Sequence, residues 1–166
     1  MPKISAIILT LNEERNIARC LNSLKDVVDE IVVVDSFSTD KTESIVSQYK
    51  ARFVKHEFLG YIEQKNFALK LASHDHILSL DADEALSPEL RASVFEVKEK
   101  FDCDGYYMNR LANYCGQWIR HSGWYPDKKM RLFNRKMGVW KGTNPHDKYV
   151  LNTKAKSGFL AGDILH

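Results

Sequence analysis

The sequence predicts an α/β fold built on a mostly parallel sheet, and three observations carry this prediction. Continuous apolar segments recur at 4–10, 30–36 and 76–80. Each is followed by a stretch in which apolar residues recur at helical spacing. A segment rich in aromatic and β-branched residues follows residue 104. Because strands that alternate with helices pair in parallel beneath those helices, we expect a layered α/β architecture.

The first strand and the first helix have clear local signals. Residues 4–10, ISAIILT, form the continuous apolar run of a strand that is buried on both faces. Asn12 is the expected cap of the next helix, because its side chain can accept a hydrogen bond from a free backbone amide. Three apolar residues then recur on one helical face: Ile17, Leu21 and Leu24. We therefore expect a buried strand followed by an amphipathic helix.

The elements between residues 30 and 101 continue this alternation. The segment STDKT offers caps for a second helix, and Ser87-Pro88 marks a strong helix start, since serine suits the N-cap and proline the first helical position. The expected segments, in order, are a strand at 30–36, a helix around 45–49, a short strand at 52–56, a helix at 61–73, a strand at 76–80 and a helix that begins after Ser87.

The sequence changes in character after residue 104. GYYMNRLANYCGQWI, 105–119, has the pattern of a hairpin or meander, and three later segments look like short strands: 129–134, 138–140 and 155–166. No linker separates the halves, so we expect 1–104 and 105–166 to pack as one domain. The last residues, GDILH, carry no turn signal, so the sequence reads as the front part of a longer chain.

Composition indicates an ordinary soluble globular protein, with 44% hydrophobic and 28% charged residues. No apolar run is long enough for a signal peptide or a membrane span. The three cysteines lack the paired spacing of a zinc site, which favours reduced thiols and a cytoplasmic location. Residues 1–104 carry a net charge of −6 and residues 105–166 one of +8. The basic half is therefore expected to face an anionic partner.

Polar residues follow three of the predicted strands. They are Thr10, Asn12 and Glu13; Asp35, Ser36, Ser38 and Asp40; and Asp81, Asp83 and Glu84. In open α/β sheets, ligands bind beyond the carboxyl ends of the strands, so these three ends are expected to converge. Asp, Asn and Ser also favour turns, so each end taken alone is equally compatible with a turn.

The triplet Asp81-Ala82-Asp83 is suited to a divalent metal. Mg²⁺ and Mn²⁺ take oxygen ligands, often one or two carboxylates together with substrate phosphates. Alternation along an extended segment would place Asp81 and Asp83 on the same side. A metal held there would neutralise a leaving diphosphate as a Lewis acid, so we expect Mn²⁺ or Mg²⁺ as the cofactor.

Four segments together resemble a known family: ISAIILTLNEERNIARCLNSL, EIVVVDSFSTDKT, QKNFALKLASHDHILSLDADEAL and NPHD. They are similar to the family 2 nucleotide-sugar glycosyltransferases of GT-A fold, in the branch that builds the lipopolysaccharide inner core. The resemblance covers essentially the whole chain. It implies a three-layer sandwich around a mixed, mostly parallel sheet. It also implies an enzyme that transfers a sugar onto an acceptor hydroxyl with inversion. The donor is expected to be UDP-linked, because members of the family commonly use such donors.

The resemblance also implies roles for individual residues. Thr10, Asn12 and Glu13 would border the nucleotide, and Asp35 would bind its base. The helix that carries Gln64, Lys65 and Asn66 would flank the base and ribose. Asp81 and Asp83 would bind ribose and metal, with His166 as a further metal ligand. At the second strand, this sequence has DSFSTD where the family has D-D-G-S-x-D, which puts the contacts of that loop in doubt.

Asp147, which follows His146 in NPHD, stands where the resembled family has its catalytic base. A carboxylate in reach of the acceptor hydroxyl can accept its proton. Asp127, in WYPDKK, is the rival candidate, and a turn aspartate is the alternative reading of Asp147. His146 is expected to orient its loop, with contact to the acceptor as the alternative.

The acceptor is expected to contact the back half, where aromatic residues alternate with arginine and lysine. Aromatic faces pack on sugars, and arginine suits phosphates and carboxylates. This favours an anionic glycolipid or oligosaccharide and a peripheral contact at the inner face of a bacterial inner membrane. No recognised nucleic-acid module is present, so nucleic acid is not an expected partner.

Two other functions fit parts of the sequence. A catalytically inactive nucleotide-sugar-binding module would keep the binding residues without transfer. A haloacid-dehalogenase-like phosphatase also has a D-x-D loop, but on its first strand, whereas here the motif follows a later strand and Ala85 occupies the fifth position. Metal-dependent hydrolysis of an aryl phosphate would distinguish the phosphatase from a transferase.

Overall fold

The computed structural model describes all 166 residues and contains four helices and twelve strands. The helices are α1 (Ile17–Leu24), α2 (Thr42–Val46), α3 (Tyr61–Leu71) and α4 (Pro88–Glu99). The strands of the front half are β1 (Ile4–Thr10), β2 (Glu30–Asp35), β3 (Arg52–Lys55), β4 (His76–Asp81) and β5 (Ala85–Leu86). Those of the back half are β6 (Gly105–Leu111), β7 (Asn113–Tyr114), β8 (Gln117–Trp118), β9 (Asp127–Asn134), β10 (Gly138–Thr143), β11 (His146–Leu151) and β12 (Ser157–Leu165).

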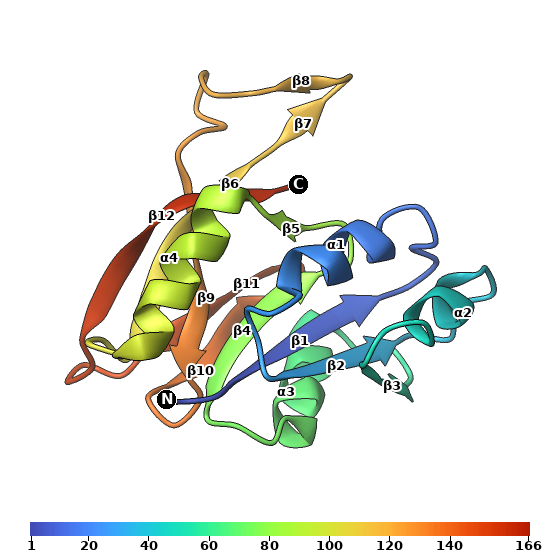
Figure 1. The fold of residues 1–166 in the computed structure, drawn as a ribbon, viewed down its shortest axis with the longest axis horizontal. Coiled ribbons are helices and arrows are strands. Elements are labelled where there is room, and N and C mark those ends of the chain that lie inside the picture. Colours follow the sequence, from blue (N-terminus) through green and yellow to red (C-terminus); the bar gives the residue numbers. More distant parts are fainter.

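Eight strands form one mixed sheet in the order β3-β2-β1-β4-β9-β6-β12-β5. The first four run parallel, as the alternation of strands and helices predicts. β9 is antiparallel to both β4 and β6, β12 is parallel to β6, and β5 is antiparallel to β12. The sheet therefore runs without a break from the front half into the back half (Figure 1). The predicted α/β class with a mixed sheet is confirmed.

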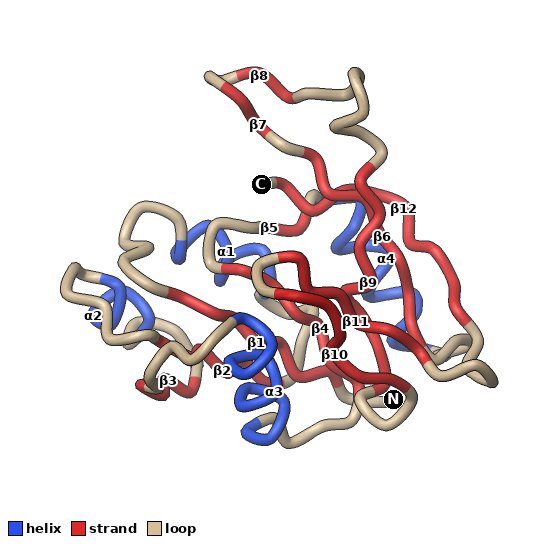
Figure 2. Tube along the Cα trace, turned by 180° about the vertical axis from the view of Figure 1, so that it is seen from behind, coloured by secondary structure: helices blue, strands red, loops and turns tan.

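Two apolar cores cover the two faces of this sheet. The larger core contains the apolar side of α1 and α4, with Ile17, Leu21 and Leu24 buried as predicted. The smaller core lies under α3 and the β10–β11 hairpin and contains Phe133, Trp140 and Tyr149. Figure 1 shows α1 and α4 in front of the sheet, and Figure 2 shows α3 and the hairpin on the opposite side. The result is three layers with the sheet in the middle.

The start of α4 agrees with its sequence signal, whereas that of α1 does not. Ser87 Oγ accepts a hydrogen bond from Leu90 N at 3.1 Å, and Pro88 is the first helical residue. The prediction that Asn12 caps the first helix is wrong, because α1 begins only at Ile17. Asn12 has a positive φ of 53°, and its side chain accepts from Thr39 N across the neighbouring loop. A tertiary contact has replaced the local cap.

The back half forms the predicted short strands, together with one that the sequence did not indicate. The hairpin expected within 105–119 is present as β7 and β8, which project from the body of the molecule (Figure 1). β11 is the additional strand. Its sequence HDKYVL has only one buried residue, Tyr149, so its apolar pattern is weak, and pairing with β10 stabilises it. None of the helices is long and apolar enough to span a lipid bilayer.

Candidate active site

The polar ends of β1, β2 and β4 converge at one edge of the sheet, as parallel pairing requires. They border a cavity of about 400 Å³, here called the strand-end cavity. Six of the predicted site residues line it: Thr10, Glu13, Gln64, Asp81, Asp83 and His166. Its other lining residues are Leu9, Leu11, Ser36, Phe58, Tyr61 and Ala82. The cavity thus combines residues from the ends of the parallel strands with the last residue of the chain.

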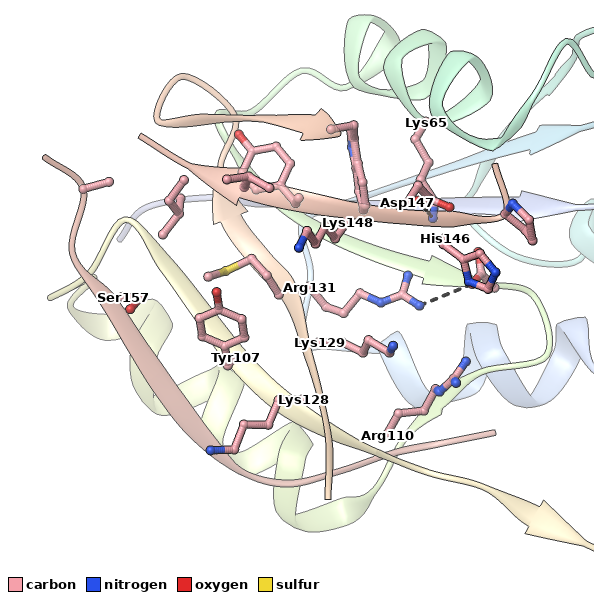
Figure 3. Close-up of a pocket in the computed structure, with 18 residues that line it drawn as sticks. Lys65, Tyr107, Arg110, Lys128, Lys129, Arg131, His146, Asp147, Lys148 and Ser157 are labelled. Carbon is pink, nitrogen blue, oxygen red and sulfur yellow. Dashed lines mark hydrogen bonds and ion pairs between the residues drawn. The ribbon is translucent and has the colours of Figure 1, made fainter. Parts of the chain in front are cut away.

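A second cavity, of about 550 Å³, lies beside the first and is called the basic cavity. Its walls come from β4, β6, β9, β10, β11, β12 and α3, and Figure 3 shows its lining side chains. Six of them are cationic: Lys65, Arg110, Lys128, Lys129, Arg131 and Lys148. Asp81 and Asp147 are its only carboxylates. Asp81 lines both cavities, so the two spaces meet at this side chain.

A buried arginine holds Asp81. Arg131 Nη2 lies 3.3 Å from Asp81 Oδ2 and 2.9 Å from Glu84 Oε1. Glu84 is fully buried, and its other oxygen accepts from Asp81 N at 2.9 Å. Burial raises the pKa of Glu84, while the neighbouring guanidinium opposes that rise. Glu84 was predicted only as a strand-end residue, and Arg131 only as one of the back-half cations expected to face the acceptor. A lone arginine in the apolar strand KMRLFN nevertheless signals a buried acidic partner.

Asp83 and His166 face each other at the mouth of the strand-end cavity, with Oδ2 and Nε2 3.2 Å apart. The hydrogen bond from His166 holds the pKa of Asp83 below its ordinary value, and the same bond raises the pKa of His166. Asp81, by contrast, is bound by Arg131. No group of three His, Cys, Asp or Glu side chains is arranged to hold a metal.

The donor atoms of Asp83 and His166 nevertheless suit Mn²⁺ or Mg²⁺. A carboxylate oxygen and an imidazole nitrogen are accepted ligands of Mn²⁺, and such ions commonly complete their coordination with water and substrate phosphates. Two convergent protein ligands at the rim of an open cavity are sufficient for that arrangement. The predicted set of Asp81, Asp83 and His166 is therefore brought to one cavity, but only two of its members converge.

Lys65 and Asp147 form an ion pair inside the basic cavity. Nζ and Oδ2 lie 2.5 Å apart, and the two side chains are only 6% and 4% exposed. Lys65 also lies over the ring of Trp140, 4.5 Å from its centroid. Asp147 Oδ1 accepts no hydrogen bond from the protein and remains the free oxygen of this carboxylate. The family resemblance assigns Lys65 to the nucleotide, but in the structure it lies with Asp147 in the basic cavity and not in the strand-end cavity.

Asp127 is arranged differently from Asp147. Its Oδ2 is 3.0 Å from Arg110 Nε, and its Oδ1 is 3.0 Å from Lys129 Nζ. Both oxygens are therefore engaged by cations, and Asp127 does not line the basic cavity. Of the two candidate bases, only Asp147 combines a free oxygen with a place in a cavity that also contains Asp81.

Asp35 and Asn12 contribute to the shape of the loop after β2. Asp35 is fully buried; its oxygens accept from Ser38 Oγ at 2.5 Å and from Ser38 N at 2.8 Å. Asn12 N in turn donates to Ser38 Oγ. Neither residue lines the strand-end cavity. In this structure both hold the loop together, and their predicted contact with a nucleotide stays a prediction.

Comparison with known proteins places this geometry in a family. The profile of "Glycosyl transferase family 2" matches residues 5–153. A relative from Rickettsia felis, described as an uncharacterized glycosyltransferase, is 40% identical over 92% of this chain and 56% of its own length. The lipopolysaccharide core biosynthesis glycosyltransferase LpsC of Rhizobium meliloti is 42% identical over 100% of this chain and 64% of its own. The chain spans about half the length of the Rickettsia relatives that it matches.

Solved structures agree with these relatives. S. aureus TarS in complex with UDP is similar with a TM-score of 0.59 and 29% identity, over 72% of this chain and 38% of that one. Glucosyl-3-phosphoglycerate synthase of Mycobacterium tuberculosis, in complex with Mn²⁺, UDP and glucosyl-3-phosphoglycerate, has a TM-score of 0.54 and 26% identity, over 68% and 44%. Such glycosyltransferase neighbours confirm the predicted GT-A fold and give no support to the phosphatase alternative. The chain belongs to glycosyl transferase family 2.

Proposed function

We propose that this chain transfers a sugar from a nucleoside diphosphate donor, UDP-linked, onto a hydroxyl of a glycolipid or oligosaccharide, with inversion at the anomeric carbon. One observation carries the proposal: a cavity at the strand ends and a cavity with a free carboxylate oxygen meet at Asp81. Two reactants bound in adjoining cavities are held close to the geometry of reaction, which supplies much of the rate.

The donor belongs in the strand-end cavity. Similar structures contain UDP, and one contains UDP with Mn²⁺. Asp83 and His166 would hold a divalent metal at the diphosphate, and such a metal stabilises the negative charge that develops as the diphosphate leaves. Thr10, Glu13 and Gln64 line the rest of this cavity beside Asp81. Asn12, Asp35 and Lys65 are the proposed nucleotide residues that need a rearrangement to reach it.

The acceptor belongs in the basic cavity, with its reacting hydroxyl at Asp147. The hydroxyl oxygen attacks the anomeric carbon from the side opposite the diphosphate. The bond from that carbon to the diphosphate breaks, and the diphosphate leaves with the electron pair. Asp147 Oδ1 accepts the hydroxyl proton as the new glycosidic bond forms. Attack from the opposite side accounts for the inversion.

The charge of the basic cavity favours an anionic acceptor. Lys128 and Lys148 have no carboxylate partner in the structure, whereas the other four cations are paired. The relative LpsC is named for lipopolysaccharide core biosynthesis, which fits a lipopolysaccharide core acceptor. A cytoplasmic protein with peripheral contact to the inner membrane is consistent with such an acceptor and with the net charge of +8 in the back half.

Two substitutions test this division of labour. Asp83→Ala removes a metal ligand, so Mn²⁺-dependent binding of UDP should be lost in calorimetry. Asp147→Asn keeps the size of the side chain and removes the base, so UDP binding should persist while sugar transfer falls by about 10²-fold or more. Asp26→Ala, at an exposed turn outside both cavities, is the control and should change neither quantity. Equal loss of UDP binding in both test variants would contradict the proposal.

An inactive nucleotide-sugar-binding module is the second candidate. The ion pair of Lys65 with Asp147 favours it, because one oxygen of the proposed base is already occupied. The two functions differ in one measurement. UDP-sugar binding without Mn²⁺-dependent release of the sugar, to acceptor or to water, would support the binding module.

A further inference from the structure

Two aromatic side chains at one wall of the basic cavity face solvent, and the proposed chemistry gives them no role. Tyr107 on β6 and Phe159 on β12 are 38% and 50% exposed. They are partners in the register of these two parallel strands, so both point to the same face of the sheet. Tyr106 and Leu160 belong to the larger core on the other face. We call the rings of Tyr107 and Phe159 the aromatic platform.

A β-bulge in β9 brings a lysine to the same face. One step along β6, from Tyr106 to Tyr107, corresponds to two steps along β9, so Arg131 is an extra residue there. Arg131 and its neighbour Met130 consequently both line the basic cavity, although adjacent residues of a regular strand point to opposite faces. Lys128, two residues before Met130, lines the cavity as well. The bulge thus places a cation on the face that carries the aromatic platform.

Lys128 is available to a ligand. Its Nζ lies 5.7 Å from the centroid of the Phe159 ring, and no carboxylate is paired with it. The neighbouring cations Arg110 and Lys129 are both engaged by Asp127. A cation–π contact at an exposed site is weak, so an anion can draw the ammonium group off the ring. The aromatic platform therefore has a free positive charge at its edge.

The aromatic platform is set apart from the reacting centre. Asp81 ends β4, and the strand order from there is β4-β9-β6-β12. Neighbouring strands lie about 4.8 Å apart, so Tyr107 and Phe159 are about 10 and 14 Å away from β4 along the sheet. Figure 3 shows Tyr107 and Lys128 across the cavity from Asp147. A sugar whose hydroxyl reacts at Asp147 leaves the platform uncovered, whereas the next unit of the same acceptor would cover it.

We propose that Tyr107, Phe159 and Lys128 form a second acceptor subsite, which binds the sugar unit next to the reacting one and an anionic group on that unit. One face of a sugar ring consists largely of C–H groups and packs on aromatic rings. Lys128 binds the anionic group, a phosphate or a carboxylate. The inference rests on the proposed function, since it takes the acceptor to lie in the basic cavity. It adds that the acceptor is an oligosaccharide with negative charge beside the reacting sugar.

The test separates the sugar ring from the charge. Glucose 6-phosphate, glucuronate, glucose and inorganic phosphate are titrated by NMR, which detects weak binding, in the presence of a chelator. The wild type should bind at least one of the two anionic sugars more tightly than it binds glucose or phosphate, because ring and charge both contribute. The tighter of the two anionic sugars identifies the group as a phosphate or a carboxylate.

The variants should divide these contributions. Phe159→Ala and Tyr107→Ala should weaken the better anionic sugar roughly fivefold, the loss expected when some 40 Å² of apolar ring is no longer covered, and leave phosphate binding unchanged. Lys128→Ala should weaken the anionic sugar and phosphate roughly two- to fivefold and leave glucose binding unchanged. Phe159→Tyr and Lys128→Arg keep the ring and the charge, so both should bind as the wild type does.

Phe95→Ala and Lys3→Ala are the matched controls. Phe95 is 50% exposed, as Phe159 is, Lys3 is exposed near the N-terminus, and neither lines a cavity of the site. Both controls should bind every probe as the wild type does.

UDP is titrated separately with Mn²⁺, so that failure of the subsite is distinguished from failure of the proposed function. A wild type that binds UDP but none of the sugars would overturn the subsite and leave the proposed function intact. Sugar affinities that are indifferent to Phe159→Ala, Tyr107→Ala and Lys128→Ala would do the same. A wild type that binds no UDP at all would remove the proposed function and the subsite together.

Discussion

Asp147, Glu84 and Asp81 show how single residues set the character of this site. Each is a carboxylate paired with a cation from a distant part of the chain: Lys65 for Asp147, and Arg131 for both Glu84 and Asp81. A buried charge without a partner is strongly destabilising, so these pairs fix which carboxylate oxygens remain free. One oxygen of Asp147 and one of Asp81 are left facing the cavities, where ligands can reach them.

The pair of Asp83 and His166 makes stability depend on pH. The hydrogen bond from His166 lowers the pKa of Asp83. The contribution of Asp83 to the free energy of unfolding is therefore fully present above the ordinary pKa of 3.8, and it is lost as pH falls through the lowered pKa. The hydrogen bond to Asp83 raises the pKa of His166. The contribution of His166 to the free energy of unfolding is therefore complete below the ordinary pKa of 6.5, and it is lost as pH rises through the raised pKa. The pair should therefore stabilise the metal-free protein most between pH 3.8 and 6.5.

Thermal unfolding of the wild type and of His166→Gln, in the presence of a chelator, checks this window. The difference in Tm should be largest inside it and should shrink toward neutral and alkaline pH, and added salt should reduce it because both groups are partly exposed. In an Asp83→Asn background, the substitution of His166 should have little effect. A difference that grows as pH rises above 6.5 would show that the ion pair is not its source.

At the scale of elements, α4 lies directly on β12. Ser87 Oγ accepts from both Leu90 N and Asp163 N, so one hydroxyl caps the helix and joins it to the strand. Gly162 lies at this contact with a positive φ of 94°, and a Cβ there would overlap the backbone of Leu90. β12 leads directly to His166, which lines the strand-end cavity. The contact between α4 and β12 therefore also positions His166.

Substitution of Gly162 measures how close this contact is. Gly162→Ala should lower the free energy of unfolding by about 1 kcal/mol for the positive φ and by a further 1–3 kcal/mol, roughly, for the overlap with α4. Gly123→Ala is the matched control, since Gly123 also has a positive φ but faces open space. Urea denaturation gives the loss in the free energy of unfolding for each variant, and the difference between the two losses is the cost of the overlap with α4. Equal destabilisation would mean that β12 can move away from the helix freely.

At the scale of the whole molecule, the sheet makes one unit of two chemically different halves. β4 pairs with β9 through Ile77 and Phe133 and through Leu78 and Leu132. The larger core likewise combines Ile4 and Leu80 of the front half with Met108, Leu160 and Ile164 of the back half. Neither half has a complete core of its own. The predicted division into a nucleotide-sugar-binding half, 1–104, and an acceptor-binding half, 105–166, stays a prediction about function.

Cooperative unfolding should follow from this shared sheet. All four helices lie in the front half, and all three tryptophans, Trp118, Trp124 and Trp140, lie in the back half. Far-ultraviolet circular dichroism therefore reports mainly on the helices of one half, and tryptophan fluorescence on the other. In urea, the two signals should change with the same midpoint. A fluorescence transition at a clearly lower urea concentration would reveal a back half that unfolds independently.

The parts of the fold that were predicted correctly depend on local patterns. The strands at 4–10, 30–36 and 76–80 are continuous apolar runs, and Ser87-Pro88 is a complete helix start in two residues. The convergence of the β1, β2 and β4 ends also followed from the sequence, because parallel strands have their carboxyl ends at one edge. The prediction that Asn12 caps the first helix was wrong, because the backbone amide of Thr39, in a neighbouring loop, donates to the Asn12 side chain instead.

The amino-acid sequence by itself determined the strand–helix alternation, the family and the residues that gather at the strand ends, because apolar periodicity and motif spacing act over short stretches of chain. Only the tertiary structure decided that Arg131 holds Asp81 and Glu84, that Lys65 joins Asp147, and that His166 reaches Asp83. Each of these pairs depends on strand register and on packing between distant segments. Since a buried charge can be paired by any suitable partner in reach, the choice of partner is settled by the three-dimensional arrangement.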